Sequence, residues 1–193
     1  MELRNKSIVI VGASSGIGAA AARLFAREGA NLVLGARRSG ELEHLAQEVA
    51  MLGGRAAFLS GDVKDEGYAE QLTCLAVSEF GRLDGAFNNV GLVGDMQPVG
   101  EMTLANWNEV IAVNLTSAFL AAKAQIPTLE RQGAGSIVFT SSFVGFSNGG
   151  LPGMAAYAAA KAGVIGMVQS LASDCAAAGV RVNALLPGGT VTP

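Results

Sequence analysis

The chain has 193 residues and a formal net charge of −3, and half of its residues are hydrophobic while only 15% are charged. This length suits one domain with one core, and the high apolar content excludes intrinsic disorder. The sequence lacks a basic run, which argues against nucleic-acid binding, and its two Cys and one His argue against a disulfide scaffold or a metal site. Gly is in excess: 26 of the 193 residues, about 13%, are Gly, against a usual share of about 7%. Particular backbone positions should therefore require it.

The N-terminal segment predicts neither a signal peptide nor a membrane anchor. Its apolar run, Ile8–Val11, ends at Gly12 and is too short for either. Later apolar stretches are interrupted by charged residues such as Lys123 and Lys161. We therefore expect a cytoplasmic protein without a membrane partner.

Short aliphatic runs alternate along the chain with alanine-rich stretches of helical character. The predicted strands are Ser7–Val11, Asn31–Ala36, Arg55–Ser60, Gly85–Asn88, Ser136–Ser141 and Val180–Leu186. The predicted helices span residues 16–29, 39–52, 65–80, 102–131 and 154–178. A glycine falls at or just past the end of each helical run, where a left-handed cap favours it: Gly29, Gly53, Gly81, Gly133 and Gly179.

The pattern of the strands predicts an α/β fold. Ile8–Val11 and Ile137–Phe139 show no polar alternation, which indicates burial on both faces of a parallel sheet. Strand–helix–strand repetition implies right-handed crossovers and a doubly wound sheet with helices on both faces. No linker, repeat or shift of composition marks a second domain, so residues 1–193 are expected to form one domain.

A glycine-rich segment, G-A-S-S-G-I-G, follows the first predicted strand and opens the first helix. Gly12, Gly16 and Gly18 permit a tight turn and the close approach of phosphates, and the N–H groups of the helix start attract an anion. Ser14 and Ser15 add hydroxyl donors. A purely structural role for the glycines is the alternative, but this turn is where a doubly wound fold binds a dinucleotide.

The end of the second strand bears on the choice of dinucleotide. A site selective for NAD usually places an acidic residue here to bind the ribose hydroxyls, and Ala36 stands in that place. Arg37 and Arg38 follow it and offer cations for a 2′-phosphate. Solvation of a loop is the alternative role for both arginines. We expect NADP(H) to be preferred over NAD(H).

The strongest chemical signal is the segment Y-A-A-A-K, from Tyr157 to Lys161. Residues four apart lie on one face of a helix. An ammonium beside a phenol favours the phenolate, so we expect Lys161 to lower the pKa of Tyr157 and make it a workable general acid/base.

Further polar residues are expected at the carboxyl edge of the sheet. Thr140, Ser141 and Ser142 end one buried strand, and Asn88–Gly91 ends another. A hydroxyl there can stabilise charge that develops on a substrate carbonyl, although strand-end capping is the alternative. Asn114 lies inside a helical pattern, where Asn is unfavourable, so a polar function is expected beside the plainer reading of ordinary helix polarity.

Taken together, these motifs resemble the short-chain dehydrogenase/reductase family over nearly the whole chain. The residues that carry the resemblance are G-A-S-S-G-I-G at 12–18, G-D-V at 61–63, N-N-V-G at 88–91, Asn114, T-S-S at 140–142, Y-A-A-A-K at 157–161 and P-G-G-T at 187–190. The resemblance implies a Rossmann-like, dinucleotide-binding domain with about six strands in the order 3-2-1-4-5-6.

The resemblance also implies the roles of the site residues. Tyr157 would be the catalytic acid/base, and Lys161 would lower its pKa and hold the nicotinamide ribose. Ser142 would polarise the carbonyl, and Asn114 would hold a water of the proton relay. The cofactor would meet several segments: Gly12, Ser14, Ser15, Gly16, Ile17 and Gly18 at the phosphates, Arg37 and Arg38 at the 2′-phosphate, Asp62 and Val63 at adenine, Asn89, Val90 and Gly91 at the ribose region, and Pro187 and Gly188 at the nicotinamide.

The chain departs from the family pattern at a few positions. Val11 stands where Thr is common, and Val90 stands for Ala. Ser141 and Ser142 are adjacent, and Ser142 is chosen as catalytic by alignment alone. The chain also ends at Val191–Pro193, inside the family's substrate loop, so that loop and a last strand are expected to be truncated or not represented.

The sequence therefore predicts an NADP(H)-dependent oxidoreductase that interconverts a carbonyl and a secondary alcohol of a small molecule. The alternative is a cofactor-binding regulator, or an inactive truncated form, of the same fold. The apolar helix 154–178, with helix 102–131, predicts a homodimer or homotetramer. The segment Ser142–Met154 is rich in Gly and small apolar residues, which indicates an uncharged substrate.

Overall fold

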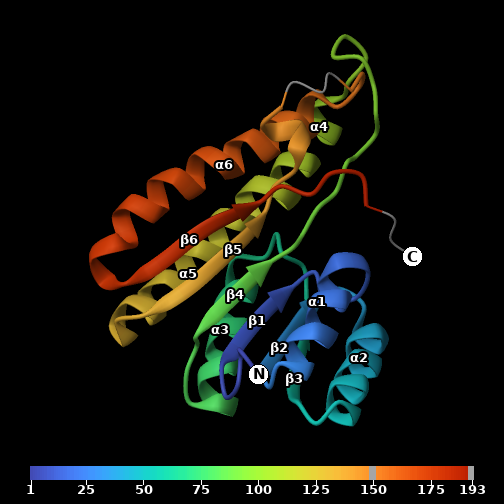
Figure 1. Ribbon diagram of the computed structural model, residues 1–193. Coiled ribbons are helices and arrows are strands. Elements are labelled where there is room, and N and C mark those ends of the chain that lie inside the picture. The colour runs from blue at the N-terminus through green and yellow to red at the C-terminus, as the bar shows by residue number, and fades with distance from the viewer. Residues whose placement is uncertain (148–150, 191–193) are drawn as a thin grey trace.

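The structure, a computed structural model, describes residues 1–147 and 151–190. Strands and helices alternate along these residues (Figure 1). The strands are β1 (Ser7–Val11), β2 (Asn31–Ala36), β3 (Arg55–Ser60), β4 (Gly85–Asn88), β5 (Gly135–Thr140) and β6 (Val180–Leu185). The α-helices are α1 (Gly16–Arg27), α2 (Ser39–Met51), α3 (Glu66–Phe80), α4 (Leu104–Ile111), α5 (Ser117–Gln132) and α6 (Ala155–Cys175).

The strands form one parallel sheet in the order β3-β2-β1-β4-β5-β6, which confirms the predicted topology. The chain moves outward from β1 to β3, then returns to pair β4 with the other edge of β1. The strand order therefore reverses between β1 and β4. In an open α/β sheet, such a reversal leaves a crevice at the carboxyl ends of the two strands, where ligands bind.

Two apolar cores lie on opposite faces of the sheet. On one face, α1 and α2 cover Ile8, Ile10 and the leucines of β2. On the other face, α3, α5 and α6 cover a larger cluster that includes Val9 and Ile137. Figure 1 shows the two groups of helices on either side of the strands. Five of five β1 residues are buried, as the uninterrupted apolar run predicted.

The outer strand β6 is buried on one side only. Val180 and Val182 face the core, whereas Arg181 and Asn183 are exposed, so the burial alternates as in a half-covered strand. The prediction of two buried faces also holds less well for β5, where Val138 is only half-buried. Helices α1 and α2 lie over β1–β3, and Val138 of β5 is only partly buried against the edge of their core.

The predicted helix 102–131 is wrong as a single element. The first helix of this stretch, α4, begins at Leu104. The Thr103 hydroxyl caps it by accepting a hydrogen bond from the Asn106 N–H at 3.1 Å. A π-helical turn, Ala112–Thr116, then separates α4 from α5. The other differences are at element ends: β5 begins and ends one residue earlier than predicted, and α6 passes into a 3₁₀ turn, Ala176–Ala178.

The five glycines predicted at helix ends all have left-handed backbone conformations. Their φ angles lie between 71° and 85°, which residues with a side chain rarely adopt: Gly29, Gly53, Gly81, Gly133 and Gly179. These glycines end the helices and turn the chain into the next strand. This explains in physical terms a part of the Gly excess.

The stretch Leu104–Gln132 is long and apolar enough to cross a membrane by those two criteria alone. A core helix of a folded domain meets the same criteria. Here Leu120, Ala121 and Leu129 are buried, and α5 contacts α3, α6 and the sheet. Packing within the domain therefore accounts for part of the apolar character of this stretch.

A buried pair of amides connects the sheet to α5. The Asn88 Nδ2 donates to Gln125 Oε1 at 2.9 Å, and the Gln125 Nε2 donates to Asn88 Oδ1 at 3.0 Å. Gln125 is 1% exposed and Asn88 is 7% exposed, so each amide depends on the other for its partner. The pair holds the end of β4, from which the segment 89–91 continues.

We predict that Gln125→Met lowers the free energy of unfolding by about 1–3 kcal/mol, because the Asn88 amide would be left buried without a partner. Urea unfolding followed by circular dichroism measures this difference. Gln169→Met, at an exposed position of α6, is the matched control and should change stability by less than about 0.5 kcal/mol. Equal stability of the two variants would contradict the role assigned to the pair.

Candidate active site

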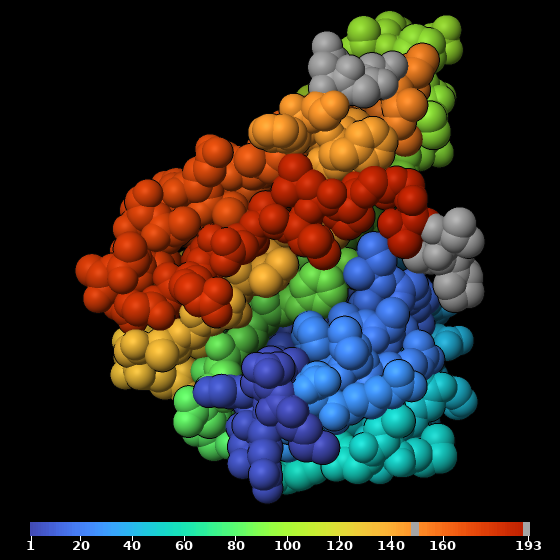
Figure 2. Space-filling model, viewed as in Figure 1, coloured from blue at the N-terminus to red at the C-terminus, as the bar shows by residue number. Residues whose placement is uncertain are grey.

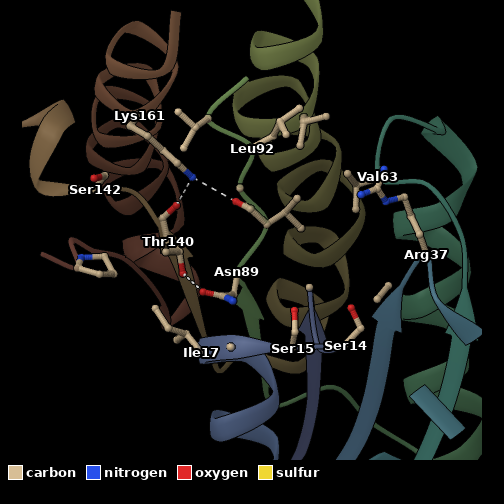
Figure 3. A pocket seen from close by; sticks show the side chains of 18 of the residues that line it. Ser14, Ser15, Ile17, Arg37, Val63, Asn89, Leu92, Thr140, Ser142 and Lys161 are labelled. Carbon is tan, nitrogen blue, oxygen red and sulfur yellow. Dashed lines mark hydrogen bonds between the residues drawn. The ribbon is translucent and has the colours of Figure 1, made fainter. Parts of the chain in front are cut away.

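A pocket of about 630 Å³ opens at the carboxyl edge of the sheet. Loops that follow β1, β2, β3, β4, β5 and β6 all contribute to its lining. Figure 3 shows side chains from these loops directed into one space. All residues predicted for the site line this pocket except Gly18 and Asn114. The volume is in the range of small-molecule and cofactor sites.

The glycine-rich loop packs closely against the segment that follows β4. Gly12 has a φ of 81°, and a Cβ there would lie 2.5 Å from the Asn89 carbonyl oxygen. A Cβ on Gly18 would overlap the Gly12 carbonyl oxygen. Gly18 therefore lies behind the loop and supports it, which explains why it does not line the pocket.

The start of α1 leaves backbone N–H groups available at the pocket. Ser15 has an extended backbone and caps the helix without a side-chain hydrogen bond. Gly16 and Ile17 stand in the first turn and line the pocket. N–H groups of a first helical turn have no partner within the helix, so this end suits an anion such as a phosphate.

The end of the pocket next to β2 and β3, where the sequence predicts the adenosine part of a cofactor, gathers cations. Arg37 and Arg38 line it, and the Arg38 guanidinium donates to Ser14 Oγ at 3.1 Å. Lys64, which the sequence analysis missed, also lines it beside Asp62. Its Nζ donates to both Glu109 carboxylate oxygens at 2.9 and 3.0 Å, and this hydrogen bonding raises the pKa of Lys64. The position of Lys64 directly after the predicted pair Asp62 and Val63 is the signal that would have found it.

Lys161, on α6, lines the end of the pocket opposite Arg37 and Arg38 and is 1% exposed. Its Nζ donates to the carbonyl oxygens of Thr140 at 2.8 Å and of Val90 at 3.1 Å, as Figure 3 shows. Burial lowers the pKa of Lys161 to about 8. The two carbonyl groups are the partners that make a buried ammonium tolerable.

The two adjacent serines have different environments. Ser141 is buried, and its hydroxyl donates to the Lys161 carbonyl oxygen at 2.8 Å. Its hydroxyl is thus committed to the backbone of α6. Ser142 Oγ accepts a hydrogen bond from the Val144 N–H at 3.3 Å, and its hydroxyl lies near enough to Tyr157 to lower the pKa of that phenol against the effect of burial. This arrangement favours Ser142 as the hydroxyl that meets a substrate.

Tyr157 does not have the lowered pKa that the sequence led us to expect. Burial raises the pKa of its hydroxyl, and the hydrogen bond with Ser142 opposes that rise only in part. The Lys161 Nζ lies 5.6 Å from the centre of the tyrosine ring and bonds to backbone carbonyls. The ammonium therefore lies over the face of the ring, and burial of the hydroxyl favours the neutral phenol.

Asn114 lies in the π-helical turn and holds the loop that follows β4. Its amide donates to the carbonyl oxygens of Leu92 at 2.7 Å and Val110 at 2.8 Å, and its Oδ1 accepts from the Leu92 N–H at 3.2 Å. It lines a second cavity of about 20 Å³ behind the pocket. The contacts make Asn114 a positioning residue for Leu92, and the water relay stays a prediction.

A further contact joins the ends of β4 and β5. The Thr140 hydroxyl donates to Asn89 Oδ1 at 2.9 Å (Figure 3). Thr140 was noted in the sequence only as part of a strand end, and the structure places it in the pocket lining. Part of the expected substrate-contacting region, residues 148–150 and 191–193, lies outside the described residues.

Comparison with known proteins places these features in context. A family model described as short chain dehydrogenase matches residues 6–193. Cyclohexanol dehydrogenase of Acinetobacter sp. (strain SE19) is 34% identical over 192 residues, which are 100% of this chain and 76% of that protein. The 3-oxoacyl-(acyl-carrier-protein) reductase of Thermotoga maritima is 39% identical over 193 residues, or 100% of this chain and 77% of that protein. The crystal structure of levodione reductase superposes with a TM-score of 0.94 at 33% identity, covering 99% of this chain and 74% of that one.

We predict a pH dependence of stability that arises from Lys161. Its pKa is about 8 in the native protein against 10.5 when unperturbed, so between these values the unfolded chain binds a proton that the native protein has lost. The free energy of unfolding of the wild type should therefore rise relative to that of Lys161→Met from pH 8 to pH 10, by about 2 kcal/mol. Urea unfolding at several pH values measures it.

The matched control is Lys123→Met. Lys123 is an exposed lysine whose pKa is raised by hydrogen bonding to Glu66, so its replacement should produce no such rise below pH 10. Parallel stability curves for the wild type and Lys161→Met over this range would disprove the prediction.

Proposed function

Because the chain belongs to the short-chain dehydrogenase/reductase family, we propose that it is an NADP(H)-dependent oxidoreductase that interconverts a carbonyl and a secondary alcohol. The observation that carries this proposal is that Ser142, Tyr157 and Lys161 line the same pocket as the glycine-rich loop. A substrate bound in this pocket would lie next to both an acid/base side chain and the proposed cofactor site.

The residues of the pocket fit a dinucleotide. Gly12 and Gly16 line the pocket beside the open start of α1, whose N–H groups meet the charge of phosphate groups. When bound, the cofactor supplies the hydride chemistry, and the chain supplies position and proton transfer.

Tyr157 carries the proton in the proposed mechanism. During reduction of a carbonyl, its hydroxyl donates a proton to the substrate oxygen, and during oxidation the phenolate accepts one. Ser142 donates a hydrogen bond to the same oxygen and stabilises its developing charge. The phenol is protonated near neutral pH, which is the form that donates a proton in reduction, and burial raises its pKa further. Lys161 stabilises the phenolate that reduction leaves behind.

We infer that NADP(H) is preferred from the residues at the end of β2. Ala36 provides no carboxylate for ribose hydroxyls, and Arg37 lines the pocket beside Arg38 and Lys64. A 2′-phosphate carries the charge that such a group of cations neutralises.

The names of the relatives support the reaction class. One acts on cyclohexanol and another on a 3-oxoacyl thioester, and both reactions interconvert a carbonyl and a secondary alcohol. For this chain we also propose a homodimer or homotetramer through the α4–α5 and α6 faces. Trp107 and Phe119 expose 36% and 52% of their surface on the α4–α5 face, which supports that proposal. The cytoplasmic location stays a prediction of the sequence.

We predict that Tyr157→Phe lowers kcat for carbonyl reduction by about 10²–10⁴-fold, because the proton donor is removed. The dissociation constant for NADPH should change by less than about twofold, since the ring remains. NADPH oxidation and fluorescence titration measure the two quantities with a panel of ketones, aldehydes and oxoacyl thioesters.

Tyr68→Phe is the matched control for this experiment. Tyr68 is the other tyrosine of the chain, and its hydroxyl donates to the Leu59 carbonyl oxygen at 2.7 Å, away from the catalytic end. It should retain turnover. A Tyr157→Phe variant with normal turnover would refute the assignment, and NADPH binding without turnover by the wild type would favour a regulatory protein.

We predict that Arg37→Asp moves the cofactor preference from NADPH toward NADH. Loss of a charge-assisted bond to the 2′-phosphate, with repulsion added, should weaken NADPH binding about 10- to 100-fold relative to NADH. Titration with both cofactors measures the ratio. Arg131→Asp, in the last turn of α5, is the control and should leave the ratio unchanged. Tighter NADH binding by the wild type would refute the preference.

A further inference from the structure

The cationic residues of this chain are distributed unequally along the pocket. Arg37, Arg38 and Lys64 line its adenosine end. Figure 3 places Arg37 and Ser142 at opposite sides of the pocket. From Leu83 to Pro193 the sequence has four cationic residues only: Lys123, Arg131, Lys161 and Arg181.

Three of these four lie away from the carboxyl edge of the sheet. Lys123 pairs with Glu66 on α3. Arg131 is in the last turn of α5, where it donates to Thr128, and Arg181 is near the start of β6. Lys161 alone is at the catalytic end, and its ammonium is buried and bonded to two backbone carbonyls. Among the described residues from Leu83 onward, no exposed cation lines the pocket near Ser142 and Tyr157.

The side chains beside the catalytic group are apolar. Leu92, Val93 and Val113 line the pocket with Ser142 and Tyr157. Leu92 is 37% exposed and Val93 is 38% exposed, so both present apolar surface to a ligand.

Two loops extend this apolar surface beyond the sheet edge. The Gln97 N–H donates to the Gly153 carbonyl oxygen at 3.2 Å, which joins the segment after β4 to the segment before α6. Met96 and Leu151 are exposed on these segments. Figure 2 shows the two segments side by side at the end of the molecule that carries α4.

The charges that these loops do carry are negative. The segment 91–103 includes Asp95 and Glu101 and no Lys or Arg. Both acidic residues are exposed. An anionic group on a substrate would be removed from water next to apolar side chains and like charges, at a cost that no nearby cation offsets.

We propose that the substrate is an uncharged, apolar ketone or secondary alcohol. The same apolar and acidic side chains disfavour a substrate that carries anionic groups, such as a carboxylate or an acyl thioester of coenzyme A. This inference rests on the proposed function, because it concerns the substrate end of that site. Leu92 and Val93 contact the apolar body of the substrate, and its oxygen meets Ser142 and Tyr157.

The test uses two alcohols of the same ring and nearly the same shape, cis-4-methylcyclohexanol and cis-4-hydroxycyclohexanecarboxylate. We expect kcat/KM with NADP⁺ to be at least about tenfold higher for the methyl compound. Acetoacetyl coenzyme A, reduced with NADPH, adds a thioester that carries anionic groups. It should be a poorer substrate than 4-methylcyclohexanone.

A charge placed in the pocket should change this selectivity. Val93→Lys should raise the ratio of kcat/KM for the carboxylate over the methyl compound by about tenfold, because it supplies the missing cation. Val99→Lys is the matched control, since Val99 is 76% exposed on the same loop and does not line the pocket. It should change the ratio by less than about twofold. Melting temperature and NADPH affinity show whether each variant is folded.

The outcomes separate the two proposals. Higher activity of the wild type on the carboxylate or the thioester overturns this inference and leaves the oxidoreductase function intact. An unchanged ratio in folded Val93→Lys also overturns it. Absence of hydride transfer with every compound, while NADPH binds, overturns the proposed function and this inference together.

Discussion

The buried ammonium of Lys161 is the interaction on which the geometry of the site depends. It donates to carbonyl groups from the ends of β4 and β5, while the Ser141 hydroxyl donates back to the backbone of α6. Three elements distant in sequence are thereby held at fixed separations. Burial of the charge is unfavourable in itself, as the lowered pKa shows, so the bonds to Val90 and Thr140 are required for this arrangement. The catalytic end of the pocket is thus positioned by a group that also faces the Tyr157 ring.

Contacts through Asn89 connect this arrangement to the glycine-rich loop. Asn89 connects the two halves, since its side chain accepts from Thr140 and its carbonyl oxygen lies against Gly12. Gly12 in turn is supported by Gly18 at the first turn of α1. The glycine-rich turn and the end of β5, which Ser142 follows, are therefore parts of one packed arrangement. A shift of either loop would displace the other, because the contacts leave no space for a side chain.

Most of the sheet could be predicted from local patterns in the sequence, whereas several pocket residues, such as Asp62 and Pro187, were predicted only from the resemblance to a family. Apolar runs in the sequence located the strands. Glycines just past the helical runs located the helix ends, and in the structure they have positive φ angles. The Asn88–Gln125 pair could not be predicted, since 37 residues separate its members and neither has a distinctive neighbourhood. The raised pKa of Tyr157 was also missed. A spacing of four residues on a helix indicates proximity to Lys161, but the pKa depends on burial and on where the ammonium points.

The π-helical turn Ala112–Thr116 has a consequence for how this chain tolerates length changes. A π turn adds a residue to a helical turn, so the faces of α4 and α5 are rotated relative to those of a continuous α-helix. Removal of one residue here would restore a regular helix and turn Asn114 away from Leu92. Surface loops absorb insertions and deletions readily, whereas this helix interior has a strict residue count. A single-residue deletion at this turn would therefore displace the loop that Asn114 holds, whereas a deletion in a surface loop would not.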